Sequence, residues 1–153
     1  MSDKKVIDHL NIILGNELVA INQYFIHAKI LADQGFSKLA SVAKAESIDE
    51  MKHADEIIER ILFLKGVPNM NNYAKVNVGK DVVKMIENDL NTEIKAIKDL
   101  KVAISACVEN NDIGSKDMLE KILISEEEHL DFLETQLNLI EKVGLENYLA
   151  TQI

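Results

Sequence analysis

The chain has 153 residues, of which 47% are hydrophobic and 28% are charged, with one proline, six glycines and no tryptophan. This length suits a single domain, residues 1–153, and the many helix-forming residues with few turn residues predict an all-α fold. The net charge of −9 argues against binding to nucleic acid or to anionic membranes, because both partners require a basic surface. An acidic chain is compatible with a protein that handles cations.

No segment is apolar over the length of a membrane span, and the charged start MSDKKVIDHLN differs from a signal peptide. We therefore expect a cytoplasmic protein with no membrane partner. The one cysteine, Cys107, can form neither an internal disulfide nor a thiolate metal cage. Any metal must be bound by carboxylates and imidazoles.

Apolar residues at helical spacing predict a first long helix over residues 5–34, which ends at Gly35. Ser37 can cap a second helix, which stops at Gly66 and Pro68. The gap between the two helices is so short that they must form an antiparallel hairpin.

The segment GVPNMNNYAKVNVGKD, residues 66–81, lacks helical periodicity and predicts an unusually long connection. Fully extended, it spans about 50 Å, whereas the preceding helix is roughly 40 Å long. It can therefore return along the whole bundle and make the second and third helices parallel.

A third helix is predicted from about residue 82 to ENNDIGS, and a fourth from there to Gly144. The final residues, LENYLATQI, indicate a short fifth helix that requires packing to be stable. The expected fold is a four-helix bundle with a long crossover between helices two and three and a short C-terminal helix.

Each long helix carries a carboxylate inside its apolar stripe, and two of these carboxylates are followed three residues later by a histidine on the same face. Ionised carboxylates that face a bundle core cost several kcal/mol unless a cation compensates them. Exposure at the stripe edge or salt bridges could explain any single one, but no Lys or Arg lies close enough in the stripes to neutralise all four. The six residues are Glu17, Glu50, His53, Glu93, Glu126 and His129.

Four carboxylates and two imidazoles supply about three ligands to each of two ions and leave open positions, which suits iron or manganese. The order Glu, Glu-x-x-His, Glu, Glu-x-x-His on four successive helices is the known ligand pattern of ferritin-like di-iron carboxylate proteins. A single Glu-x-x-His motif is common by chance. Two such motifs, each preceded by a lone stripe Glu, are far more specific.

The chain resembles the bacterioferritins over essentially its full length, in the segments LGNELVAINQYF, ESIDEMKHAD, ERILFL and EEEHLDFLETQLNLI. The resemblance implies iron storage in a shell of 24 subunits, a ferroxidase centre within each subunit that uses O2 or H2O2, and a ferredoxin-type electron donor. It makes Glu50 and Glu126 bridging ligands, Glu17 and Glu93 terminal ligands, and His53 and His129 the nitrogen ligands.

The resemblance also identifies Met51 as an axial haem ligand, shared across a two-fold axis, with about one haem per two subunits. One residue after Glu50 is about 100° further around the helix, so Met51 cannot point at the same metals. Leu18, Ile21, Phe25 and Ile48 could line the apolar slot for the porphyrin. Without the resemblance, an outward Met is more simply an ordinary surface or interface residue.

Several residues outside the six-residue set have possible roles near the metal site. Tyr24 lies two turns after Glu17, where its phenol could hydrogen-bond a ligand or donate an electron, although a buried core tyrosine explains it equally well. Asp89, one turn before Glu93, could orient a liganding histidine. Ala45 stands where family members often have a histidine of an inner-surface iron site, of which Asp49 remains. We expect His9 and His27 to be surface or packing residues.

Three alternative functions remain at this stage. A rubrerythrin-like peroxidase also uses paired Glu-x-x-His motifs, but such proteins usually carry a cysteine-rich module, which one cysteine cannot form. A mini-ferritin of the DNA-protecting kind builds its metal site between subunits and would not need a complete ligand set in one chain. A bundle whose metal site is purely structural is the non-enzymatic alternative.

Overall fold

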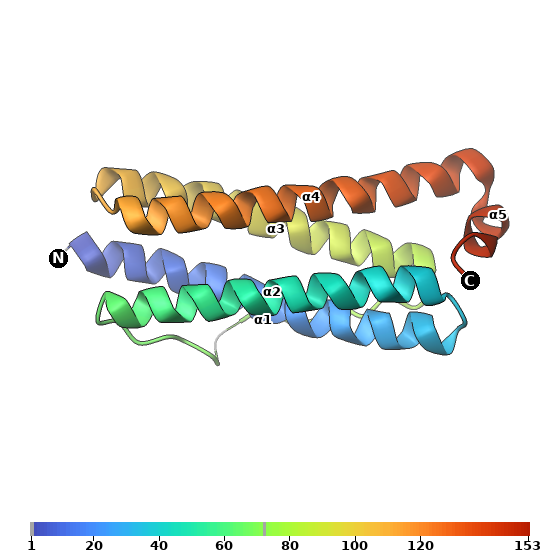
Figure 1. Cartoon of the computed structure of the whole chain (residues 1–153), viewed down its shortest axis with the longest axis horizontal. Helices are drawn as coiled ribbons and strands as arrows, with labels where there is room; N and C mark the ends of the chain where they lie inside the picture. The colour runs from blue at the N-terminus through green and yellow to red at the C-terminus, as the bar shows by residue number, and fades with distance from the viewer. Residues whose placement is uncertain (1, 72) are drawn as a thin grey trace.

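The computed structural model describes residues 2–71 and 73–153 and consists of helices joined by turns and one long crossover (Figure 1). Four long helices lie side by side, and a short fifth helix packs across one end of the bundle. The helices are α1 (Ser2–Asp33), α2 (Ser37–Phe63), α3 (Val82–Glu109), α4 (Ile113–Val143) and α5 (Leu145–Ala150). The expected all-α four-helix bundle is confirmed.

The crossover between α2 and α3 runs back along the bundle, so that these two helices point in the same direction (Figure 1). Side chains of α1 hold it at both ends. Asn11 bonds the carbonyl of Val67 at 3.1 Å and the backbone N–H of Asn69 at 2.8 Å. The backbone N–H groups of residues 77 and 79 donate to side chains further along α1. The long connection is therefore fastened to the bundle by hydrogen bonds between its backbone and side chains of α1.

The predicted helix ends are accurate to within a few residues, but the capping role of Ser37 is wrong. Ser37 is the first residue of α2, Phe36 takes the N-cap position, and no side chain caps this helix. Side-chain caps occur instead at α3, where Asp81 accepts from the N–H of Lys84, and at α4, where Asp112 accepts from the N–H of Ser115. Gly35 has φ 91°, a conformation that favours glycine and ends α1 sharply.

The short helix α5 is held by tertiary contacts, as its length requires. Tyr148 is buried, and its hydroxyl donates to Oε1 of Gln136 on α4 at 2.8 Å. The carbonyl of Gln152 accepts from the N–H of Lys38 at 2.9 Å, which joins the C-terminal segment to the first turn of α2.

The interior divides into two apolar clusters with a layer of polar side chains between them. The first cluster includes Leu10, Leu14, Ile57, Leu100 and Leu119 and fills the end of the bundle near the α3–α4 turn. The second lies toward α5 and includes Leu31, Leu39, Ile86, Leu133 and Tyr148. The layer between them contains Glu17, Tyr24, Glu50, Glu93 and Glu126, each at most 1% exposed.

Candidate metal centre

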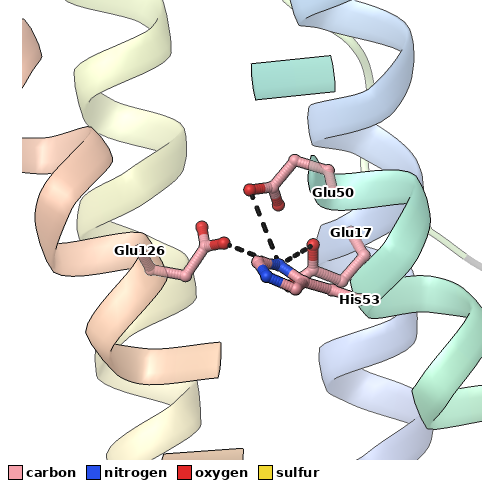
Figure 2. A group of neighbouring side chains, drawn as sticks. All are labelled: Glu17, Glu50, His53 and Glu126. Atoms are coloured by element: carbon pink, nitrogen blue, oxygen red, sulfur yellow. Dashed lines mark ion pairs between the residues drawn. The ribbon is translucent and has the colours of Figure 1, made fainter. Parts of the chain in front are cut away.

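The six carboxylate and imidazole residues come together in the polar layer, each from the helix expected to supply it. Glu17 comes from α1, Glu93 from α3, and a Glu-x-x-His pair from each of α2 and α4. Figure 2 shows the α2 pair, Glu50 and His53, beside Glu17 of the neighbouring α1, with Glu126 of α4 facing them from the opposite side of the bundle interior. Side chains from four helices thus converge within one chain.

The cluster consists of two overlapping groups of four residues, in each of which one potential ligand atom per residue lies within 4.8 Å of the others. The His53 half contains Glu17, Glu50, His53 and Glu126, and the His129 half contains Glu50, Glu93, Glu126 and His129. Glu50 and Glu126 belong to both halves. His53 Nδ1 lies 3.1 Å from Glu126 Oε1, and His129 Nδ1 lies 3.1 Å from Glu50 Oε1.

These side chains are buried but incompletely bonded. Among the described residues, eight buried side-chain oxygen and nitrogen atoms have no hydrogen-bond partner, and all eight belong to the six residues of the cluster. Buried polar atoms are almost always paired in proteins, and leaving one unpaired costs about 1–3 kcal/mol. Carboxylate oxygens and imidazole Nδ1 atoms that face one another without hydrogen-bond geometry fit a pair of cations such as iron or manganese.

Burial and mutual repulsion also change the protonation of the cluster. Burial raises the pKa of the Glu17, Glu50 and Glu93 carboxyls well above their usual range, and neighbouring carboxylates add to the rise. Burial by itself lowers the pKa of His129, but the carboxylates of Glu50 and Glu93 outweigh it and raise that pKa to about 12. Without metal the cluster therefore retains protons, which bound cations would displace.

Tyr24 lies on the His129 side of the cluster. Its buried hydroxyl donates a hydrogen bond to Glu93 Oε1. Burial, together with the charge of Glu93, raises the pKa of this phenol well above its usual value. The hydroxyl thus stays protonated and remains a donor to a cluster carboxylate.

The expectation that Asp89 orients a liganding histidine is wrong. Asp89 Oδ1 instead accepts from His27 Nδ1 at 2.9 Å and from Gln23 Nε2 at 2.8 Å. His27 Nε2 accepts from the N–H of Gly79 at 3.0 Å, and Gln23 Oε1 accepts from the N–H of Asn77 at 3.0 Å. His27 is fully buried, as a packing residue would be, and this network fastens the crossover to α1 and α3.

Two acidic residues near the His129 half were not predicted in the positions they occupy. Asp49, expected only on an inner-surface route, has its Oδ2 3.3 Å from His129 Nε2. Glu46 is 7% exposed, and burial raises its pKa to about 8. Glu46 precedes Glu50 by one helical turn, so its position in the same stripe was the available signal.

Met51 lies apart from the cluster, as the helix geometry predicted. Its side chain is 55% exposed, and Phe25 and Ile48 are likewise exposed. Leu18 and Ile21 are half-buried. The role of Met51 as a haem ligand remains a prediction.

In the described ranges, no helix is both long and apolar enough to span a membrane.

Comparison with known proteins locates the chain among its relatives. The family model of the ferritin-like domain matches residues 7–143. The bacterioferritin of Streptomyces coelicolor is 47% identical over 151 residues, which cover 99% of this chain and 90% of the relative.

Other relatives give the same result. The bacterioferritin of Mycobacterium bovis is 46% identical over 148 residues, covering 97% of this chain and 93% of that protein. The bacterioferritin of Brucella melitensis is 42% identical over 146 residues, covering 95% and 91%. With the converging glutamates and histidines of its four helices, the chain belongs to the bacterioferritins, within the ferritin-like domain family.

Proposed function

We propose that the chain is an iron-storage subunit whose six clustered residues bind two Fe(II) ions and form a ferroxidase centre. The observation that carries the proposal is the set of eight buried side-chain atoms without a hydrogen-bond partner, because they all belong to those six residues. Glu50 and Glu126 bridge the two ions, Glu17 and Glu93 bind one ion each, and His53 and His129 each supply one nitrogen. All six come from one chain, as an intrasubunit site requires.

The reaction is an oxidation of the bound iron. Two Fe(II) ions become two Fe(III) ions, and the two electrons with two protons convert O2 to H2O2, or H2O2 to two water molecules. The protein supplies positioned ligands rather than a nucleophile. The Tyr24 hydroxyl donates a hydrogen bond to Glu93, which supports a role in restraining that ligand.

The test is the rate of Fe(II) oxidation by the assembled protein, followed by stopped-flow absorbance. Glu93→Ala and His129→Ala should each abolish the rapid phase, because each removes a ligand of the same metal position. Glu128→Ala is the matched control, since Glu128 lies on α4 beside His129 but is exposed. Rapid oxidation that persists in both variants would place the chemistry outside the cluster.

The storage role requires a closed assembly, and we propose a shell of 24 subunits in the cytoplasm. Large exposed apolar side chains support an assembly, among them Phe63 at 66% and Ile113 at 67% exposure. Sizing of the purified protein should give a particle of 24 times the 17.2 kDa chain mass. A small monomer would exclude storage of a mineral core.

We further propose that haem binds at the subunit two-fold through paired Met51 residues, about one haem per two subunits. A two-fold interface brings the same residue of both copies together, and Phe25 and Ile48 are exposed apolar side chains of the kind that suits a porphyrin. The haem would pass electrons from a ferredoxin-type donor to stored Fe(III). Met51→Leu should remove the haem spectrum without slowing Fe(II) oxidation, whereas the exposed control Met70→Leu should retain it.

A further inference from the structure

The two histidines of the cluster are held in different ways. Each directs Nδ1 toward the carboxylates, at 3.1 Å from Glu126 Oε1 for His53 and 3.1 Å from Glu50 Oε1 for His129. The opposite nitrogen of His129 meets Asp49 Oδ2 at 3.3 Å. In the part of the chain that the structure describes, His53 Nε2 has no hydrogen-bond or ion-pair partner.

The contact of Asp49 fixes the tautomer of His129. A histidine that binds a metal through Nδ1 carries its proton on Nε2, and this N–H donates to Asp49. A carboxylate in that position orients the ring and makes the metal-binding nitrogen more basic. Since Asp49 is on α2 and His129 is on α4, the contact also spans two helices.

Apart from the inner-surface role that the family resemblance implies, the contact with His129 is the interaction that the structure gives Asp49. Its side chain is 46% exposed, and His129 is its one ion-pair partner among the described residues. A half-exposed carboxylate contributes little as a surface charge pair. Its effect must therefore act through the imidazole that it contacts.

We propose that Asp49 is a positioning residue for His129, which makes the His129 half of the centre the tighter of the two metal positions. The inference rests on the proposed function, because it assumes that both halves bind metal. The His53 half lacks an equivalent partner, so its imidazole must be oriented by the metal itself. Loss of such a partner typically weakens metal binding 10- to 100-fold, and that loss should be confined to the His129 half.

The experiment is a titration of metal-free assembled protein with Co(II), whose visible absorption reports the coordination of each position. Glu17→Ala leaves only the His129 half intact, and Glu93→Ala leaves only the His53 half intact. Adding Asp49→Ala should weaken Co(II) binding about 10- to 100-fold in the first background and alter its absorption band. In the second background, the same change should have less than about a two-fold effect.

Two controls separate positioning from general damage. Asp49→Asn keeps an oxygen acceptor for the N–H of His129 and should restore part of the affinity. Asp55→Ala removes an exposed aspartate from the same helix and should leave both affinities unchanged. Circular dichroism and sizing should show that every variant remains folded and assembled.

The outcomes are distinguishable. If the native chain binds two Co(II) ions but Asp49→Ala leaves both affinities unchanged or lowers both equally, the positioning role is wrong and the proposed centre stands. If the native chain binds no Co(II) at the cluster, both proposals are overturned.

Discussion

The two apolar clusters and the polar layer between them are built by the same four helices, yet burial of their side chains has opposite effects on the stability of the fold. In the clusters, leucine and isoleucine side chains fill the interior and stabilise the fold. In the layer, buried carboxylates face one another with unpaired oxygen atoms, an arrangement that costs free energy. The clusters therefore stabilise the bundle, whereas the layer costs stability in the metal-free protein.

A matched pair of substitutions on α1 should sharpen this contrast. Leu14 and Glu17 are one turn apart and at most 1% exposed. Leu14→Ala should lower the free energy of unfolding by about 2–5 kcal/mol, because it leaves a cavity. Glu17→Leu should leave the metal-free protein as stable or raise its stability by about 1–4 kcal/mol, because it replaces a buried unpaired carboxyl.

The measurement for this pair is chemical denaturation of metal-free protein at pH 8, followed by circular dichroism. Saturating Co(II) should reverse the order of the native chain and Glu17→Leu, because only the native chain retains both metal positions. Equal losses of stability from the two substitutions would contradict the division between layer and clusters.

The second prediction concerns pH. Glu46 has a folded pKa of about 8, above its unfolded value of 4.5, so the stability that its proton confers is lost as pH rises between those values. The raised pKa values of Glu17, Glu50, Glu93, His53 and His129 act in the same direction. The metal-free protein should therefore be more stable at pH 5.5 than at pH 8.

The part due to Glu46 can be isolated with Glu46→Gln. Over this pH interval, Glu46 contributes up to about 3 kcal/mol, so the variant should show a flatter dependence of the melting temperature on pH. The exposed Glu59 provides the control Glu59→Gln, which should keep the native slope. A metal-free protein that becomes more stable from pH 5.5 to pH 8 would contradict the protonated state of the layer.

How far the sequence predicts the molecule depends on whether a feature lies within one helix or between helices. Helical periodicity identifies which residues face inward, and it was sufficient for the helix positions and the convergence of the six residues, while the length of the crossover predicted the parallel second and third helices. It does not identify partners across the interior. Asp89 was therefore assigned to a liganding histidine rather than to His27, and the contact of Asp49 with His129 was not predicted.

The assignment of Ser37 was wrong for a local reason. Serine is favoured at an N-cap, but here the preceding Phe36 packs against the apolar cluster near α5. With Phe36 packed in this cluster, α2 starts at Ser37, one residue earlier than the capping preference of serine indicates.

The hydrogen-bond network of His27, Asp89 and Gln23, which fastens the crossover, allows a test with a smaller expected effect. His27→Leu leaves the N–H of Gly79 without a partner and removes one of the two hydrogen bonds to Asp89 Oδ1, so it should cost about 1–3 kcal/mol. His9→Leu, on the same helix but half-buried, should change stability by less than about 0.5 kcal/mol. Hydrogen exchange at the Gly79 amide should accelerate only in His27→Leu, and equal exchange in both variants would exclude the fastening role.

The most direct measurement is the location of iron in crystals soaked anaerobically with Fe(II), determined by anomalous scattering at the iron edge. We predict two peaks within each four-helix bundle, one beside His53 and one beside His129, with Glu50 and Glu126 between them. Iron found only at exposed surface carboxylates, with no peak among these six residues, would contradict the di-iron centre.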